Sequence, residues 1–253
     1  MYHLSPYILT HRLYLDNLRV TGGAIMKVIG LIGGMSWESS AEYYKLINQR
    51  IKEKLGGFSS AKCLMYSVDF AEIETLQVQN RWGEAGEILA DAAKRLEAGG
   101  ADFILLCTNT MHKVADKIQN SVKIPFVHIA DATCTAVKAQ GLKKVALLGT
   151  RYTMEQDFYK QRLIDSGLEV IVPEKADRDT VHNIIYEELV QGLVKHESKL
   201  RYQLIINCLE KRGAEGVILG CTEIGLLIKP QDSSIAVFDT TVIHAQTAAD
   251  MAL

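Results

Sequence analysis

One short pattern occurs twice in the chain. Residues 100–112 read GADFILLCTNTMH, and residues 213–223 read GAEGVILGCTE. When the two copies are aligned without a gap, their apolar runs coincide, and each copy predicts a buried strand followed by a turn of small polar residues. The alignment pairs the residues of the two turns: Thr108 with Cys221, Asn109 with Thr222, and Thr110 with Glu223.

The opening strands of the two halves also resemble each other. Residues 28–34 read VIGLIGG and residues 143–149 read KKVALLG, and each run is followed by a small-residue turn. Predicted strands alternate with predicted helices in both halves, which is typical of parallel α/β sheets. We therefore predict an α/β fold of two similar doubly wound parallel-sheet domains. The site should lie in the cleft between them, because ligands bind at the carboxyl ends of such strands.

The expected division has a first domain over residues 26–130 and a second over residues 131–229. Residues 230–253 are a candidate segment for packing back onto the first domain. Residues 1–25 are expected to be a poorly ordered extension, and the alternative is a docking arm for a partner. Two polar stretches, residues 69–81 and 173–180, are predicted to be loops, the first with a helical turn near the mouth of the site.

Composition excludes several function classes. The chain has 253 residues, of which 48% are hydrophobic and 23% charged, with a net charge of −2, so no basic surface for nucleic acid or membranes is expected. No apolar run approaches the roughly 20 residues that a membrane span needs. Five cysteines without zinc-site spacing suggest reduced thiols in the cytoplasm. We expect Cys63, Cys134 and Cys208 to be core residues.

A cleft between two similar turns suits proton transfer on the two faces of one small molecule. Removing a proton from one face of a carbon and returning it on the other is racemisation, and it needs a general base and a general acid. A cysteine thiolate can act as the base when its neighbours lower its pKa from the reference value of about 8.5. The amide of Asn109 and the hydroxyls of Thr110 and Thr222 would add donors for a carboxylate.

Three motifs together, GLIGGMSWESS, CTNT and GCTEIG, resemble the aspartate/glutamate racemase family over residues 26–253. The resemblance implies a two-domain α/β fold, usually a homodimer, that needs no cofactor. It also implies two catalytic cysteines on either side of the α-carbon of an acidic amino acid. No G-x-G-x-x-G or P-loop pattern is present, and we expect no nucleotide and no metal.

The chain departs from this family pattern in the first turn. The family has Cys-Asn-Thr there, whereas Thr108 precedes Asn109 and Cys107 lies one position earlier. The internal repeat independently pairs Thr108 with Cys221. Because neighbouring residues of an extended chain point to opposite faces, Cys107 should face the core. We therefore predict an asymmetric catalytic pair of Thr108 and Cys221, with L to D as the faster direction.

Further site residues follow from the resemblance. Met35 and Ser36 resemble the family's substrate-binding loop, and Gln77 lies where relatives contact the distal carboxylate, often through an arginine. Arg81 and Arg178 are candidate cations that could compensate, and Glu223 could orient Cys221. The predicted substrate-binding set is Met35, Ser36, Gln77, Asn109, Thr110, Thr222 and Glu223. His112 and His128 are expected to be structural hydrogen-bonding residues.

Two alternatives to the racemase remain open at this point. One is an isomerase or decarboxylase of the same superfamily that acts on a dicarboxylate with a single thiol. The other is a catalytically inert protein that binds a small molecule in the cleft.

Overall fold

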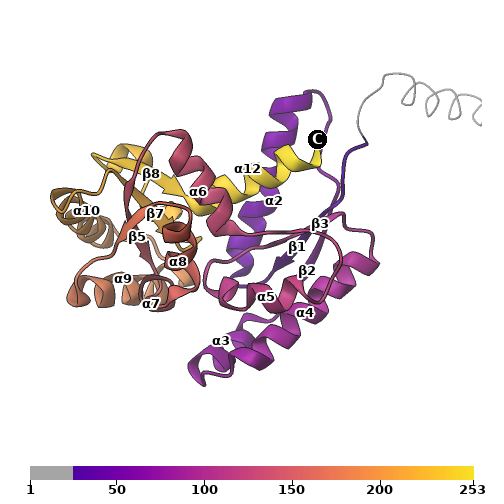
Figure 1. The fold of residues 1–253 in the computed structure, drawn as a ribbon, viewed down its shortest axis with the longest axis horizontal. Helices are drawn as coiled ribbons and strands as arrows, with labels where there is room; N and C mark the ends of the chain where they lie inside the picture. Colours follow the sequence, from indigo (N-terminus) through magenta and orange to yellow (C-terminus); the bar gives the residue numbers. More distant parts are fainter. Residues whose placement is uncertain (1–24) are drawn as a thin grey trace, which may run out of the picture.

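The computed structural model describes residues 25–253 and contains two four-stranded parallel sheets (Figure 1). The prediction for residues 1–25 falls almost wholly outside the described residues. The first sheet has the strand order β2-β1-β3-β4 and the second has β6-β5-β7-β8, so the topology is the same in both halves. The strands are β1 (Ile29–Gly33), β2 (Cys63–Ser67), β3 (Phe103–Leu106) and β4 (Phe126–Val127), then β5 (Lys144–Gly149), β6 (Glu169–Ile171), β7 (Gly216–Gly220) and β8 (Ala236–Asp239).

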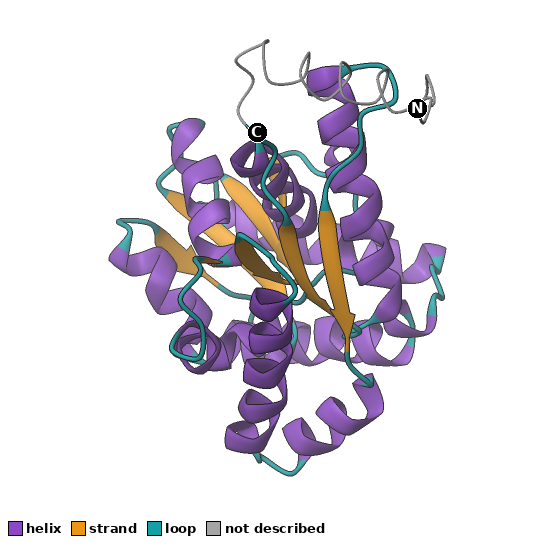
Figure 2. Cartoon of the chain, turned by 90° about the vertical axis from the view of Figure 1, so that its right-hand side faces the viewer, coloured by secondary structure: helices purple, strands orange, loops and turns teal. Residues whose placement is uncertain are grey.

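Helices lie on both sides of the strands (Figure 2), as the doubly wound prediction requires. In the first half they are α2 (Trp37–Leu55), α3 (Phe70–Val78), α4 (Trp82–Ala98), η1 (Thr110–Val114) and α5 (Ala115–Gln119). In the second half they are α6 (Ile129–Ala139), α7 (Arg151–Glu155), α8 (Asp157–Asp165), α9 (Lys175–Glu187), η2 (Leu189–Gln191), α10 (His196–Lys211), α11 (Ile224–Leu227), η3 (Pro230–Asp232) and α12 (Thr240–Ala252).

Continuous apolar strands are explained by burial on both faces. In β3, Leu105 packs in one core cluster with residues of α2 and α12, while Ile104 and Leu106 pack in another with residues of α4. The second sheet is buried in the same way, with Leu147 packed in a cluster with residues of α6 and Leu148 in one with residues of α9.

The repeated motif is also repeated in its local structure. Gly100 and Gly213 end the preceding helices with φ of +94° and +91°, a conformation that favours glycine. Two residues later, the Asp102 carboxylate accepts a hydrogen bond from Val28 N at 2.6 Å. The Glu215 carboxylate likewise accepts from Lys144 N at 2.8 Å. Each acidic side chain therefore anchors the start of a neighbouring central strand, so the aligned residues have equivalent positions.

The C-terminal segment of the chain packs on both halves of the molecule. Strand β8 pairs with β7 in the second sheet, but α12 packs with Ile29 and Tyr43 in a core cluster of the first half. Lys27 N donates a hydrogen bond to Ala252 O at 2.9 Å, and Figure 1 shows α12 beside α2. The expected domain boundary at residue 130 stays a prediction.

Most of both polar stretches that were predicted to be loops is helical. Residues 70–78 form α3, which begins where the Asp69 carboxylate accepts a hydrogen bond from Ala71 N at 3.0 Å. Residues 175–187 form α9, whose buried residues Val181, Ile184 and Ile185 pack on the second sheet. The loop prediction was wrong because the apolar residues that hold these helices are few and widely spaced among polar ones.

Exposure of the cysteines was predicted only in part. Cys134 is buried and Cys63 is partly buried, but Cys208 is exposed on α10 rather than in the core. Within residues 25–253, no helix combines the length and apolar character needed to cross a membrane.

Candidate active site

The turns that follow β3 and β7 meet at a single pocket. All nine residues predicted from the sequence line it, and the pocket encloses about 390 Å³ of space that is partly open to solvent. The predicted residues in the lining are Met35, Ser36, Gln77, Thr108, Asn109, Thr110, Cys221, Thr222 and Glu223.

Cys107 and Thr108 point to different environments, as the period of two predicted. The Cys107 side chain is fully buried in the cluster that contains Ile29 and Tyr43, and burial raises the pKa of its thiol. Thr108 lines the pocket instead. The prediction that Cys107 faces the core is therefore confirmed.

Glu223 forms the polar centre of the second turn. One carboxylate oxygen accepts hydrogen bonds from the Cys221 thiol at 3.0 Å and from the Thr222 hydroxyl at 2.8 Å. The other accepts from the hydroxyl of Ser36, which belongs to the first half of the chain, at 2.9 Å. Ser36 is also the N-cap of α2, so the carboxylate connects the start of that helix to the turn after β7.

The Cys221 thiol does not have the lowered pKa that the sequence-based argument invoked. Burial raises its pKa well above the reference value, and the negative charge and hydrogen bond of Glu223 raise it further. The resting side chain is therefore a thiol whose proton points at a carboxylate. Such a pair can form a thiolate only when the proton moves to Glu223 or leaves the pocket.

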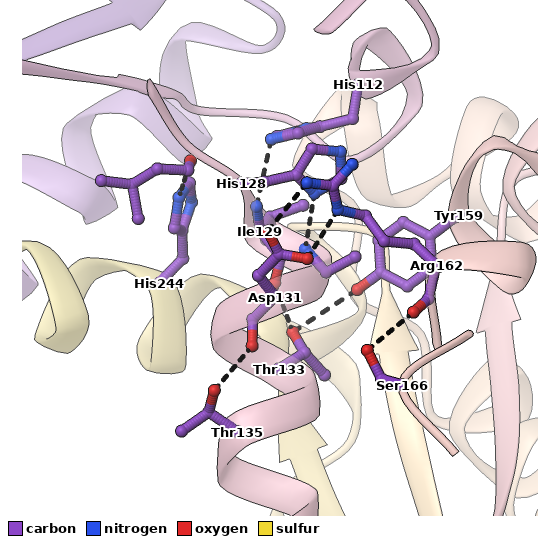
Figure 3. Close-up of polar contacts among 12 residues, drawn as sticks. His112, His128, Ile129, Asp131, Thr133, Thr135, Tyr159, Arg162, Ser166 and His244 are labelled. Atoms are coloured by element: carbon purple, nitrogen blue, oxygen red, sulfur yellow. Dashed lines mark hydrogen bonds and ion pairs between the residues drawn. The ribbon is translucent and has the colours of Figure 1, made fainter. Parts of the chain in front are cut away.

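The buried side chain of His112 forms a hydrogen bond with the backbone of the first turn. His112 Nε2 accepts a hydrogen bond from Ile129 N at 3.2 Å, so Nδ1 carries the proton and donates to the backbone oxygen of Thr108 at 2.7 Å. Figure 3 shows His112 and His128 next to each other at the start of α6, where His128 Nδ1 accepts from Ala130 N at 3.1 Å. These three hydrogen bonds agree with the predicted structural roles of His112 and His128.

The orientation of the Asn109 amide is fixed by its neighbours. The Thr240 hydroxyl donates its hydrogen to Leu219 O at 2.8 Å, so it must accept from Asn109 Nδ2, which lies 3.0 Å away. Asn109 Oδ1 is buried and has no hydrogen-bond partner among the described residues. The sequence-based interpretation used this amide as a donor, whereas the structure leaves its acceptor unsatisfied.

The remaining predicted residues complete the walls. The Thr110 and Thr150 hydroxyls lie 3.0 Å apart, and Gln77 Nε2 lies 3.0 Å from the Met111 sulfur. Neither candidate arginine lines the pocket, since Arg81 pairs with Glu84 and Arg178 with Glu155.

Sequence reasoning missed five lining residues: Phe70, Thr150, Ile185, Tyr186 and Val190. A signal existed for Thr150, because it follows the second opening strand just as Gly34 follows the first. The other four come from helical segments around residues 70 and 185–190, and no motif marks them.

A family model described as Asp/Glu/hydantoin racemase matches residues 32–248. The chain belongs to this family. The matched range includes both turns of the pocket and the N-cap of α2.

Named relatives agree with this assignment. The chain is similar to a candidate Asp/Glu racemase from Yersinia pestis of known structure, with 54% identity, a TM-score of 0.85, and coverage of 90% of this chain and 99% of that one. It is also similar to an aspartate racemase homologue from Pyrococcus horikoshii OT3, with 40% identity, a TM-score of 0.79 and the same coverage. The broad-specificity amino-acid racemase RacX of Bacillus subtilis (strain 168) is 24% identical over 223 residues, which is 87% of this chain and 96% of that protein. Racemases are isomerases.

In chemical terms, the site of this family member presents unlike groups from its two halves. The second turn contributes a thiol bonded to a carboxylate, and the first contributes hydroxyls and an amide. Within residues 25–253, no group of three His, Cys, Asp or Glu side chains is placed to hold a metal ion.

Proposed function

We propose that the protein is a cofactor-independent amino-acid racemase that uses Cys221 and Thr108 on opposite faces of the α-carbon. The observation that carries this proposal is the contact between the Cys221 thiol and the Glu223 carboxylate, at 3.0 Å, in a pocket that Thr108 lines from the equivalent turn of the other half. Family membership and the named racemases among the relatives support it.

The proton inventory of the reaction balances with these groups. Glu223 takes the proton of the Cys221 thiol, and the thiolate removes the α-proton of the amino acid. The resulting carbanion takes a proton from the Thr108 hydroxyl on its other face. Water donates a proton to the Thr108 alkoxide, and the resulting hydroxide takes the proton from Glu223, while Cys221 keeps the α-proton as its thiol, so no net proton is consumed.

Thr108 makes the two proton-abstraction steps unequal. A hydroxyl is a far weaker acid than a thiol and a poor base, so abstraction from the Cys221 side should be faster. We assign that side to the L enantiomer, so the L form should exchange its α-proton faster and have the larger kcat, whereas kcat/KM for racemisation is equal in both directions because the enantiomers have equal free energy.

Proton NMR in deuterated water tests this proposal, because abstraction followed by return from solvent removes the α-proton signal. We expect loss of the signal from L amino acids, much slower loss from the D forms, and none with Cys221→Ala. Thr108→Ala should keep exchange at the L form but stop formation of the D form. Equal rates from both enantiomers, or exchange that survives Cys221→Ala, would contradict the mechanism.

The same experiment separates the alternatives. A decarboxylase would turn the substrate into a product without its carboxylate, which gives new resonances instead of deuterated substrate. A catalytically inert binding protein would shift substrate resonances without any exchange, in the wild type and in Cys221→Ala alike.

Other parts of the sequence-based prediction stay predictions. The homodimer can be checked by light scattering, and the cytoplasmic location by fractionation of cells. The aspartate or glutamate specificity that the resemblance implies calls for a cation in the pocket.

A further inference from the structure

The side chains that line the pocket carry a single charge, and it is negative. Among the lining residues, all of which lie in the described part of the chain, Glu223 is charged, and none is lysine, arginine or histidine. Gln77, at the position where relatives often have arginine, is neutral, buried, and donates to the Met111 sulfur.

Cations close to the pocket in sequence are engaged elsewhere. Arg151, next to the lining residue Thr150, lies 3.5 Å from the Asp179 carboxylate. Arg178, on α9, lies 2.9 Å from Glu155 and also donates to Pro173 O at 2.8 Å. Releasing either would break an ion pair on the surface of the second half.

An acidic substrate would therefore bring a side-chain carboxylate, in addition to its α-carboxylate, into a pocket that already holds Glu223. Like charges in a partly desolvated site disfavour each other, and a buried carboxylate without a cation or donors is costly. The side chains of Ser36, Cys221 and Thr222 already donate to the Glu223 carboxylate, so their hydrogens are not available to a substrate carboxylate.

The rest of the wall is suited to an uncharged side chain. Phe70, Ile185, Tyr186 and Val190 line the pocket from α3, α9 and η2, and Met35 adds a thioether. Methylene groups gain free energy when they leave water for such a surface, whereas a carboxylate loses its hydration there.

The unsatisfied acceptor also indicates how the amino acid is oriented. Asn109 Oδ1 is buried without a partner, and Asn109 lines the pocket. The donor that every amino acid brings is its α-ammonium group. An ammonium at Asn109 would satisfy this oxygen and add a positive charge to a pocket whose side-chain charge is negative.

We propose that this site acts on amino acids with an uncharged side chain, with the α-ammonium bound at Asn109 Oδ1, and that it discriminates against aspartate and glutamate. The proposal rests on the racemase function above and names its substrate class. It replaces the acidic specificity that the family resemblance implies.

Pairs of nearly isosteric substrates test the charge requirement in the wild-type protein. Rates of α-proton exchange in deuterated water should give L-glutamine a kcat/KM at least about tenfold above that of L-glutamate, and L-asparagine the same advantage over L-aspartate. L-Methionine should exchange at least as fast as L-glutamine. Glutamate equal to or faster than glutamine would overturn this inference and leave the racemase function intact. Fastest exchange with L-lysine would overturn it in favour of a cationic side chain. No exchange with any of them would refute the racemase function and this inference together.

A matched pair of variants tests the cause. Gln77→Lys places a cation in the wall, and Gln77→Met is an uncharged side chain of similar length. The ratio of kcat/KM for glutamate over glutamine should rise at least about tenfold in Gln77→Lys and stay near the wild-type ratio in Gln77→Met. An equal rise in both variants would show that size, not charge, sets the preference.

The ammonium contact has its own test. Asn109→Leu should raise the Kd of L-methionine at least about tenfold while changing that of its 2-hydroxy analogue, which lacks the ammonium, much less. Equal weakening of both ligands would contradict the assignment of the ammonium to Asn109.

Discussion

Replacing Glu223 by glutamine separates two effects that this carboxylate has on Cys221. Its charge and hydrogen bond raise the thiol pKa, so removing them lowers the pKa and increases the thiolate fraction at neutral pH. If Glu223 did nothing else, Glu223→Gln would be faster than the wild type. If Glu223 takes the thiol proton, as the 3.0 Å contact indicates, the variant loses its base and becomes slower.

We expect Glu223→Gln to lower the rate of α-proton exchange by about 10²- to 10⁴-fold, which is the usual contribution of a general base. The effect on folding should be smaller, about 1–2 kcal/mol, because glutamine keeps the size and one acceptor for Ser36. Two assays are needed: proton exchange by NMR, and the pH dependence of Cys221 alkylation followed by mass spectrometry of its peptide. The mechanism would be supported if Cys221 of Glu223→Gln is alkylated at lower pH than in the wild type while α-proton exchange is slower. Exchange as fast as in the wild type would refute it.

Three other changes have defined outcomes. Thr108→Cys should raise α-proton exchange from the D enantiomer at least about tenfold, measured by the same NMR assay, because a thiol is the stronger acid and base. Burial lowers the pKa of His128 to about 3. The contribution of this residue to the free energy of unfolding is therefore fully present above pH 6.5 and falls by about 3 kcal/mol on acidification to pH 4. His128→Asn keeps an acceptor for Ala130 N and should reduce this loss in urea titrations at both pH values. A Cβ on Gly225 would lie 2.0 Å from Asp239 Oδ2, so Gly225→Ala should cost about 1–3 kcal/mol in the same titrations.

The fold was largely predictable because its core strands are short apolar runs bounded by glycine. The pairing of residues 100–112 with 213–223 identified β3 and β7, and the similarity of the opening strands identified β1 and β5. Helix α3 and the first part of α9 were missed because both helices are held by a few apolar contacts, such as Ile73 and Val181, among many polar residues. Tertiary packing, not local periodicity, decides those segments.

Within the site, the residues of the two turns after β3 and β7 were predictable from the sequence. The internal repeat, the family pattern and alternation along the extended chain together chose Thr108 over Cys107. The amide orientation of Asn109 was not predictable, because it depends on Thr240, which lies 131 residues away in the chain. The raised pKa of Cys221 depends on burial and on the rotamer of Glu223, and neither is encoded in the spacing of the motif.

The asymmetry of the site extends beyond the exchange of one cysteine for Thr108. The aligned turns also place Thr110 opposite Glu223, and the structure gives these residues different partners. Thr110 shares a hydrogen bond with the Thr150 hydroxyl, whereas Glu223 accepts the proton of a thiol. The pocket lining that comes from the first half therefore lacks a carboxylate as well as a thiol. A cysteine at position 108 would consequently remain a weaker base than Cys221, and equal rates of α-proton exchange from the two enantiomers would also need a carboxylate at position 110. If Thr108→Cys alone made the two exchange rates equal, Glu223 would not be the proton acceptor.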